Sequence, residues 1–547
     1  MTLKPQFLTH AVENQPLPLQ DYDAWSTDLP LQQAVARHGA AWAGEALQAQ
    51  GRLAGGVLIE LGEQANRHKP TLQLFDRHGR RRDHVEFHPA YHEVMRLAML
   101  AGVHNFSWRH EQRPGAHVAR AALMYLTSQP EAGTGCPLTM THAAVPALRS
   151  TPAVAAQWLP RVLGTSYDPR SVAAAHKSAC TLGMGMTEKQ GGSDVRQNTT
   201  RAWRQADGSY ELVGHKFFFS APMCDAHLVL AQAEAGLSCF LVPRLLDDGS
   251  LNAVRLQRLK DKLGDWSNAS SEVEFQGATA VALGAEGRGI ATILEMVALT
   301  RLDCVIGSAA GMRQALVQAL HHVRQRRAFG RLLSEQPLMR NVLADLALES
   351  EAAIALGLRI AAAVDAAPRD PREAAFARIA TAVGKYWVCK RTPGFVNEAQ
   401  ECLGGIGYVE ENILPRLYRQ APLNSIWEGS GNVQCLDVLR ATQREPHSRD
   451  ALFEELQAAR GADADYDRQL GELVAAFDDK ETLEQRSRQL VERLALLLQT
   501  ATLFKAGNAA IAETFCRARL GADRGLAYGT LAARAPLDAL IERAFPA

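Results

Sequence analysis

The sequence lacks a net charge, paired cysteines and long hydrophobic runs. Its 59 lysines and arginines balance 59 aspartates and glutamates, so no overall field attracts the protein to nucleic acid, anionic lipid or an acidic substrate. Any such partner has to be bound by a local patch. The nine cysteines are scattered, and none forms a C-x-x-C pair. This spacing argues against a disulfide framework and a zinc site, so we expect no bound metal and a reducing compartment.

No apolar run reaches the roughly 18 residues that a membrane-spanning helix needs. The opening segment contains Lys4, Glu13 and three prolines, where a signal peptide requires an unbroken apolar core. We therefore expect a cytoplasmic protein with no membrane partner. A composition of 47% apolar and 22% charged residues is ordinary for a globular protein, and the length predicts about three or four domains.

Residues 1–180 show mainly helical periodicity. Apolar residues recur at helical spacing in Leu31–Gln48, Tyr91–Leu100 and Ala116–Thr127, whereas the arginine-rich segment Asp76–Asp83 resembles an exposed turn. From about Cys180 the pattern changes to short alternating runs between turn residues. These runs include Tyr210–Ser220, Ala226–Ala231, Leu237–Val242 and Glu272–Phe275. Their spacing predicts a small antiparallel barrel or sandwich.

Helical periodicity returns near Gly287 and predicts a four-helix bundle. Its segments are a helix from Ile290 toward Arg327, Leu338–Val364, Ala374–Gln400 and Val433–Ala441. We expect the third to be bent or broken at Pro393–Gly394. Beyond Pro446 the same periodicity predicts five more helices. They are Asp450–Ala459, Tyr466–Phe477, Thr482–Thr502, Asn508–Leu520 and Gly525–Ala544.

The order of these segments predicts a multidomain α+β protein rather than one parallel sheet covered by helices. We expect an N-terminal helical domain at residues 1–180, a central antiparallel β domain at 181–282, a four-helix bundle at 283–445 and a C-terminal helical extension at 446–547.

One carboxylate stands in an unusual setting within Ile426–Asn432, which reads IWEGSGN. Beside the apolar pair that precedes it, the charged form of Glu428 loses hydration, so its pKa should rise toward the range of a useful base. The two glycines that follow let the backbone approach a flat ligand, because neither carries a Cβ. The alternative is a solvated glutamate before a helix capped by Ser430 or Asn432.

A second informative segment is Gly183–Asp194, which reads GMGMTEKQGGSD where helix gives way to strand. Its glycines, Thr187 and Ser193 offer amide donors and hydroxyls suited to a ring edge or a pyrophosphate. It is not the G-x-G-x-x-G fingerprint and no βαβ unit surrounds it, which argues against a nicotinamide-binding domain. An ordinary glycine loop is the alternative.

Three shorter segments complete the set. Lys216–Ser220, which reads KFFFS, ends a strand. Because three successive rings cannot all face one core, we expect one of them to face a bundle or a ligand. The alternative is that all three are buried between domains. The helix-end arginines of Arg326–Gly330 can bind phosphate. The glycine-rich bend Glu401–Tyr408 can admit an adenosine or a neighbouring subunit. A solvated charge and a plain helix-ending turn are the respective alternatives.

Taken in this order, the five segments resemble the acyl-CoA dehydrogenase family over about residues 90–440. The wording of residues 184–194 and 427–432, with the long opening and closing extensions, is similar to the family's AidB branch, the bacterial flavoproteins of the adaptive response to DNA alkylation. The resemblance implies FAD between the β domain and the bundle, and a homotetramer built from dimers.

The resemblance also implies roles for single residues. Glu428 matches the catalytic base that removes the α-proton of an acyl thioester while the β-hydride passes to the flavin. The residues implied to bind FAD are Met184, Met186, Thr187, Ser193, Phe218, Phe219, Ser220, Arg326, Gly404, Gly405, Trp427, Gly429, Ser430, Gly431 and Asn432. Phe218 replaces the usual ring-stacking tryptophan, and Arg326 matches an arginine that reaches the FAD of a partner subunit. Trp427 replaces the usual tyrosine, so its indole should narrow the cavity against long acyl chains.

Two functions follow from the resemblance. The AidB branch implies a flavoprotein that binds double-stranded DNA and protects it from alkylation damage, with weak acyl-CoA dehydrogenase activity. Its implied DNA contacts are Arg440, which matches such a position in the branch, and Arg517 and Arg519 in the extension. From Lys505 onward the extension contains six basic and four acidic residues, a small excess of positive charge. The alternative is a working dehydrogenase for a short or branched acyl-CoA, and an acyl-CoA oxidase-like enzyme is a third interpretation.

Overall fold

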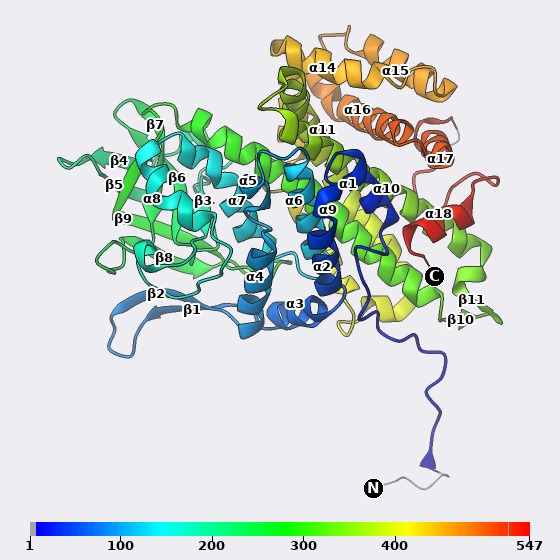
Figure 1. Cartoon of the computed structure of the whole chain (residues 1–547), viewed down its shortest axis with the longest axis horizontal. Coiled ribbons are helices and arrows are strands. Elements are labelled where there is room, and N and C mark those ends of the chain that lie inside the picture. Colours follow the sequence, from blue (N-terminus) through cyan, green and yellow to red (C-terminus); the bar gives the residue numbers. More distant parts are fainter. Residues whose placement is uncertain (1–6, 523, 547) are drawn as a thin grey trace.

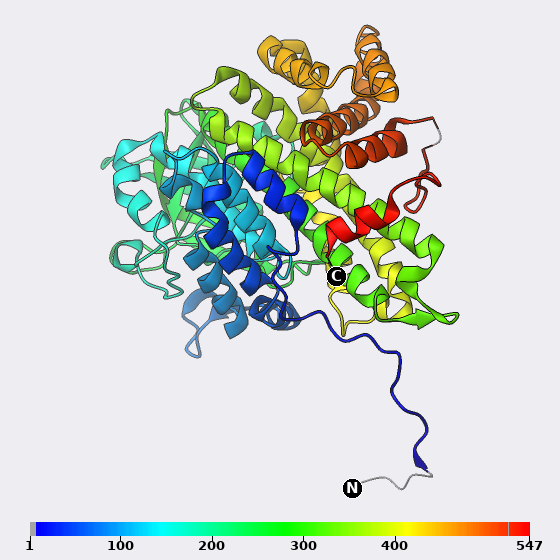
Figure 2. The same ribbon diagram turned by 45° about the vertical axis from the view of Figure 1, so that its right-hand side comes forward.

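The structure, a computed structural model, describes residues 7–522 and 524–546. Helices precede and follow a central β barrel, which confirms the α+β prediction. Figure 1 shows the barrel at one end of the molecule, the long bundle helices in the middle and the last helices on the outer side of the bundle. An extended N-terminal segment leads away from the body in Figures 1 and 2. None of the described helices is long and apolar enough to pass through a bilayer.

The N-terminal region is built from short helices. They are α1 (Leu29–Arg37), α2 (Gly44–Ala54), α3 (Val57–Arg67), α4 (Pro89–Ala101), α5 (Phe106–Arg109), α6 (Ala116–Ser128), α7 (Gly135–Arg149) and α8 (Pro152–Val162). The single helix expected over Leu31–Gln48 is instead divided between α1 and α2. Gly39 lies between them with a φ of +76°, a conformation that ends α1 and that glycine adopts without strain.

The N-terminal region is not wholly helical, because β1 (Thr71–Phe75) and β2 (Arg81–Glu86) form an antiparallel hairpin. The expected turn lies between them, where Asp76 Oδ1 accepts hydrogen bonds from the backbone N–H groups of His78 and Arg80 at 2.7 and 2.9 Å. The strands are short and β2 is mostly charged, so the sequence showed only the turn. The hairpin lies against the barrel, where the N–H of Leu256 donates to Asp83.

Seven strands form the β domain. They are β3 (Leu182–Gly185), β4 (Arg201–Arg204), β5 (Tyr210–Ser220), β6 (Ala226–Ala233), β7 (Gly236–Pro243), β8 (Val254–Leu259) and β9 (Ser270–Leu283). The pairings run β6–β4–β5–β9–β7 and return to β6, which closes a barrel around Phe219, Phe240 and Phe275. Most pairs are antiparallel as expected, but β3 and β4 each pair with β6 in parallel. The expectation of a purely antiparallel domain was wrong in that respect.

The bundle consists of three long helices and two shorter ones. They are α9 (Gly289–Val323), α10 (Pro337–Ala366), α11 (Pro371–Cys402), α12 (Leu414–Gln420) and α13 (Gly431–Arg444). The predicted break at Pro393 is absent, since α11 runs through it. An interior proline costs roughly 3 kcal/mol, and here Phe395 and Val396 are fully buried just beyond it. Packing on both sides therefore keeps α11 continuous.

The C-terminal extension covers the outer side of the bundle, as the orange and red helices of Figure 2 show. Its helices are α14 (Pro446–Gln457), α15 (Ala464–Ala476), α16 (Leu483–Lys505), α17 (Ala509–Leu520) and α18 (Leu537–Ala544). The last is much shorter than the expected Gly525–Ala544, because Gly529 has a φ of +80° and Pro536 immediately precedes α18. Leu452, Leu494 and Phe515 belong to the same apolar core as the bundle. The exact boundaries between the four parts stay predictions.

Candidate active site

A buried lysine holds the backbone of the loop that carries Glu428. Lys385, on α11, donates to the carbonyl oxygens of Trp427 at 2.7 Å and Gly429 at 2.6 Å. Between these carbonyls Glu428 has a φ of +58°, and Gly429 follows at +92°. A non-glycine residue in this conformation is strained by about 1–3 kcal/mol and persists only where surrounding contacts enforce it. The lysine supplies such contacts on both sides of the carboxylate-bearing residue.

Two further donors fix the same turn. Arg301 Nε, on α9, donates to the carbonyl oxygen of Glu428 at 3.0 Å, and Gln434 Nε2 donates to that oxygen at 3.1 Å. Arg301 is itself anchored by Asp437 at 3.0 Å. Burial alone would raise the pKa of Asp437, but hydrogen bonds and charge from Arg378 outweigh it and lower that pKa. The carboxylate of Asp437 is therefore a fixed negative anchor for the arginine behind the loop.

The Glu428 carboxylate has one close side-chain partner. The Thr300 hydroxyl donates to Glu428 Oε2 at 2.7 Å. Burial raises the pKa of Glu428 above its ordinary value, while Thr300, Lys385 and Arg301 act in the opposite direction. This confirms the expected rise. Ser430 occupies the N-cap position of α13, but its side chain makes no capping bond in the described structure, so the simple capping interpretation does not account for the loop.

The glycine-rich segment meets the Glu428 loop where the barrel faces the bundle. Met184 on β3, Met186 just beyond it and Trp427 pack against one apolar cluster. The Trp427 indole N–H donates to Asn424 Oδ1 at 2.8 Å, which fixes the ring. Two segments more than 200 residues apart in sequence thus border one apolar cluster, and we call them together the site wall.

The exposed groups at this wall fit a flat cofactor with a polar edge. A Cβ on Gly192 would come within 2.7 Å of Thr187 Oγ1, and one on Gly429 would lie 2.6 Å from Gln434 Nε2. A larger side chain at either glycine would collide with these neighbours, so glycine lets the backbone of both loops pack closely against them. Ser193 is exposed beside them. The backbone and hydroxyls of this wall therefore fit the flavin ring and pyrophosphate that the resemblance implies.

The three rings of the KFFFS segment do not alternate strictly, because the pairing of β5 with β9 shifts its register between Lys216 and Phe219. Phe218 is 52% exposed, whereas Phe219 is 1% exposed and stacks on His227 inside the barrel with ring centroids 3.9 Å apart. Phe217 lies under the Lys260 ammonium. Ser220 is partly exposed. Phe218 and Ser220 are therefore accessible for the predicted cofactor contacts, while the side chain of Phe219 is occupied in the barrel core.

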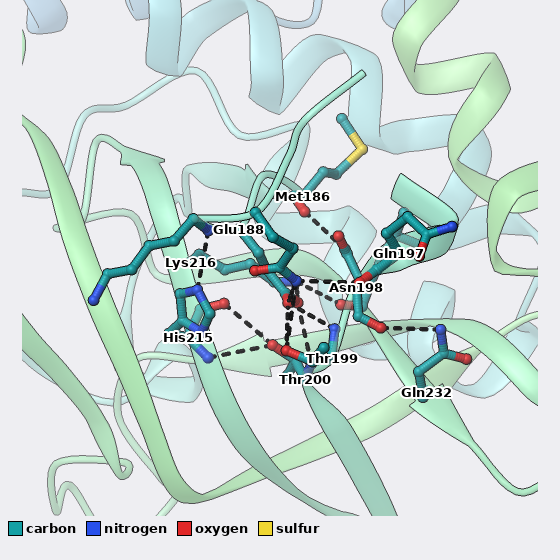
Figure 3. A network of polar contacts seen from close by, with 12 residues as sticks. Met186, Glu188, Gln197, Asn198, Thr199, Thr200, His215, Lys216 and Gln232 are labelled. Atoms are coloured by element: carbon teal, nitrogen blue, oxygen red, sulfur yellow. Dashed lines mark hydrogen bonds and ion pairs between the residues drawn. The ribbon is translucent and has the colours of Figure 1, made fainter. Parts of the chain in front are cut away.

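A buried ion pair joins the glycine-rich segment to β5 within the polar network drawn in Figure 3. Lys216 Nζ lies 2.7 Å from Glu188 Oε1, and both side chains are fully buried. Burial alone would raise the pKa of Glu188, but the Lys216 ammonium and hydrogen bonds from Thr199 and Thr200 lower it to about 2. Burial lowers the pKa of Lys216 to about 8 against the opposing charge of Glu188. Both groups are therefore ionised at neutral pH. Glu188 directly follows Thr187 in the sequence.

Three of the predicted FAD residues lie elsewhere. Arg326 donates to the backbone carbonyl of Asn14, next to β10 (Arg327–Ala328), which Figure 1 places at the end of the bundle opposite the barrel. Gly404 and Gly405 are exposed, and a Cβ on either would meet nothing within 4 Å. No hydrogen bond among the described residues links these three to the Glu428 loop.

The predicted DNA contacts differ in accessibility. Arg517 is exposed on α17. Arg440 is exposed on α13, although it pairs with Asp437. Arg519 is only 11% exposed and binds Asp345 at 2.6 Å and Glu349 at 2.9 Å. Its guanidinium therefore fastens α17 to α10, which leaves Arg440 and Arg517 as the accessible candidates.

Sequence reasoning missed the residues that hold the base. Thr300 and Arg301 lie within α9 and Lys385 within α11, far from any glycine-rich motif. Lys385 carried one usable signal, because it is a lone charge in the apolar run that leads from Ile379 to Cys389. Its partners are backbone carbonyls, which a sequence pattern does not identify. Among the described residues, no group of three or more His, Cys, Asp or Glu is placed to hold a metal ion.

A closed β barrel between helical regions, with a buried glutamate facing a glycine-rich segment, is the architecture of an acyl-CoA dehydrogenase. Family models agree along the chain. Residues 14–169 match the adaptive response protein AidB N-terminal domain, residues 183–278 the acyl-CoA dehydrogenase middle domain, and residues 287–443 the acyl-CoA dehydrogenase C-terminal domain. The chain belongs to the acyl-CoA dehydrogenase family, in its AidB branch. It is thus an acyl-CoA dehydrogenase-type oxidoreductase of a family that depends on FAD.

Individual relatives cover nearly the whole chain. The AidB protein of Escherichia coli K12 is 48% identical over 95% of this chain and 96% of its own length. Acyl-CoA dehydrogenase family member 11 of Caenorhabditis elegans is 31% identical over 84% of this chain and 76% of its own. Among solved structures, Caenorhabditis elegans ACDH-11 in complex with C11-CoA matches with a TM-score of 0.86 and 25% identity over 99% of this chain and 98% of that chain. The apo form of Bd2924 matches with a TM-score of 0.84 and 28% identity over 91% of this chain and all of that chain.

Proposed function

We propose that the site oxidises a short or branched acyl-CoA, with Glu428 as the base that takes the α-proton. The observation that carries this proposal is the position of Glu428. Its pKa is raised by burial, it accepts a hydrogen bond from Thr300, and its loop adjoins the segment that contains Met184 and Met186. A positioned base with a pKa moved toward the working pH is worth about 10²- to 10⁴-fold in rate.

The chain's own residues define what the base does. Lys385 and Arg301 hold the loop so that the carboxylate stays in its strained turn, and Thr300 holds Oε2. Thr187, Ser193, Phe218 and Ser220 would hold FAD, which supplies the acceptor for the hydride from the substrate β-carbon. The α-proton passes to Glu428, the hydride leaves with its electron pair, and a carbon–carbon double bond remains. Trp427 beside the base limits the width available to the acyl chain.

Glu428→Gln tests this role. We expect turnover to fall by about 10²- to 10⁴-fold while the yellow FAD absorbance persists. Because the folded-state pKa of Glu428 is raised, its ionisation at neutral pH opposes folding, so the uncharged variant should unfold at the same temperature or a higher one. Exposed Glu513→Gln serves as the control. Unchanged turnover in the Glu428 variant would remove it as the base.

A substrate screen addresses the acyl group. We expect short straight and branched acyl-CoAs to react faster than long ones, because Trp427 narrows the site. Since the nematode structure contains C11-CoA, the screen must extend to chains of that length. A preference for the longest chains would contradict the proposed role of the indole.

The similarity to AidB supports a second function, which is binding of double-stranded DNA with protection against alkylation damage. Arg440 and Arg517 are the exposed candidates for phosphate contact. A fluorescent duplex titrated at several salt concentrations tests this proposal. Binding that weakens as salt rises indicates phosphate contacts, because each contact releases counterions. No binding at low salt would leave the oxidoreductase as the function of the chain.

A homotetramer would complete the cofactor sites. The partly exposed Arg326 and the exposed Gly404 and Gly405 then belong to the FAD site of a partner subunit. Phe329 is 99% exposed and Tyr408 is 84% exposed in the same two segments, and rings of this kind are commonly covered by self-association. Light scattering of the purified protein gives the mass directly, and a monomer that retains FAD tightly would contradict shared sites.

A further inference from the structure

A second cavity lies between the β1–β2 hairpin, α4 and the barrel. Its volume is about 340 Å³, which falls in the range of small-molecule sites, about 300–1,000 Å³. Rings of Phe87, Tyr91 and Tyr167 line one part, and Lys177 and Arg244 line another. None of the residues predicted to contact FAD lines it. The cavity is therefore separate from the Glu428 site.

Arg244, which follows the end of β7, is the unusual group in this cavity. Its Nη1 donates to Ser171 Oγ at 3.0 Å. Its Nε is buried and has no hydrogen-bond partner among the described residues. No ion pair within 4 Å involves Arg244 there either. A buried donor without a partner costs about 1–3 kcal/mol, and a guanidinium normally finds carboxylates or carbonyls when buried. The edge formed by Nε and Nη2 is the one that binds an oxyanion in a bidentate manner.

Two of the other charges around the cavity, Lys177 and Asp168, have close ion-pair partners. Lys177 Nζ lies 2.7 Å from Asp225 Oδ1, and both side chains are 4% exposed. Asp168 accepts two hydrogen bonds from Arg170 at 2.8 and 2.6 Å, and the pKa of Asp168 is lowered mainly by these bonds. Among the described residues, the Arg244 guanidinium thus has no ion pair within 4 Å, although the charge of Asp225 also acts on it.

The two histidines of the wall add no charge at neutral pH. Burial lowers the pKa of His92 and His84, and the nearby arginines Arg82 and Arg244 lower that of His84 further. His92 instead bonds the hydroxyl of Tyr167 at 2.9 Å. The Glu86 carboxylate also lines the cavity. A single positive charge that already lies near carboxylates favours a singly charged ligand over a phosphate dianion.

We propose that this cavity is a second ligand site, which takes a small organic monoanion with its carboxylate on the Arg244 guanidinium and its carbon body in the ring-lined part. Phe87 and Tyr91 stack with centroids 4.1 Å apart and present a rigid apolar surface. Met223 is held beside them, since its sulfur accepts the N–H of Val85 at 3.2 Å. An aromatic carboxylate matches both parts of the wall.

The test is a calorimetric titration of the full-length FAD-loaded protein with benzoate, at constant ionic strength made up with chloride. We expect saturable binding with one site per chain. Arg244→Met should weaken it by about tenfold or more, and Arg244→Lys should also weaken it because the forked donor is lost. The matched control is Arg201→Met, an exposed arginine on β4 of the same barrel, which should bind benzoate as the parent does.

A second variant leaves every charge in place. Ser171 is exposed at the rim beside Arg244, so Ser171→Trp should obstruct the cavity and abolish binding without touching the core. Absence of saturable benzoate binding in the millimolar range would overturn the proposal, as would undiminished binding in Ser171→Trp or Arg244→Met. Inorganic phosphate, titrated in parallel, should bind more weakly than benzoate. Tighter binding of phosphate would overturn the assignment to a carboxylate.

Discussion

The ammonium group of Lys385 lies 2.6 Å from the carbonyl oxygen of Gly429, although the lysine is only 1% exposed. It also reaches the carbonyl of Trp427, so one buried cation holds the peptides on both sides of Glu428. Because Glu428 has a positive φ, the loop would relax without this restraint. The lysine therefore positions the base through the backbone on both sides of it.

Lys385→Met should show both the contribution of the lysine to stability and its effect on the pKa of Glu428. Two carbonyls lose charged hydrogen bonds worth about 1.5–3 kcal/mol each, so the free energy of unfolding should fall. The pH dependence of turnover should also change, because the charge of Lys385 lowers the pKa of Glu428. Its loss moves the rise in activity to higher pH, since only the carboxylate accepts a proton. Denaturant unfolding and a pH profile measure both effects.

Lys390→Met is the control, because Lys390 is exposed one turn further along α11. It should change neither the stability nor the pH profile. A Lys385→Met protein with reduced stability but an unaltered profile would show a purely structural lysine.

The Thr300 hydroxyl is the second determinant of the base. It donates to the charged form of Glu428 and so lowers the pKa of that carboxyl. Thr300→Val keeps the side-chain shape, removes the donor and should move the rise in kcat/KM to higher pH. Thr381→Val, which removes a hydroxyl bonded only to a carbonyl within α11, should leave the profile in place. A shift of the Thr300 variant toward lower pH would contradict the assigned direction.

The sequence predicted the contacts that depend on local pattern. Glycines, short strands and a glutamate after an apolar pair made Glu428 and the segment around Thr187 candidates for the site. Three successive rings in KFFFS predicted that one of them faces outward, and Phe218 does, although a register shift in β5 rather than strict alternation separates it from Phe219. Such features follow from neighbours in sequence, and for that reason they could be predicted.

Other features depend on partners far away in the chain. Lys385 acts on backbone carbonyls, and the pairing of Arg519 with Asp345 and Glu349 joins residues about 170 positions apart. Charge counting therefore treated Arg519 as a surface cation. The continuity of α11 through Pro393 has the same origin, because tertiary packing outweighs the local cost of proline.

The buried pair of Glu188 and Lys216 should dominate the acid stability of the barrel. Removing one partner of a buried ion pair costs about 3–5 kcal/mol, because the other charge is left without compensation. We expect Glu188→Gln to lose that much at pH 7, measured by denaturant unfolding, and to bind FAD more weakly because Thr187 is adjacent.

The effect of pH on that loss has a definite sign. The folded-state pKa of Glu188 is about 2, below its ordinary 4.5, so its stabilisation is present above the ordinary value and disappears as pH falls toward 2. The difference between parent and variant should therefore shrink in acid. Glu63→Gln, which breaks the exposed pair with Arg67, should cost under about 1 kcal/mol at any pH. An equal loss of unfolding free energy in both variants would mean that the buried pair stabilises the protein no more than the exposed pair does.

Substitutions of the three candidate arginines should distinguish effects on DNA binding from effects on folding. Removing the extension would be a poor test, because its helices share the apolar core of the bundle and the remainder would expose it. Arg517→Ala and Arg440→Ala remove exposed charges, so each should weaken duplex binding, reduce the salt slope by about one and leave the melting temperature nearly unchanged. Arg519→Ala leaves buried Asp345 and Glu349 short of a partner, so it should lower the melting temperature instead. The opposite result would contradict this assignment. It would be weaker DNA binding by Arg519→Ala with an unchanged melting temperature, and no effect of Arg517→Ala or Arg440→Ala on binding. The DNA would then have to contact α17 on the side that packs against α10.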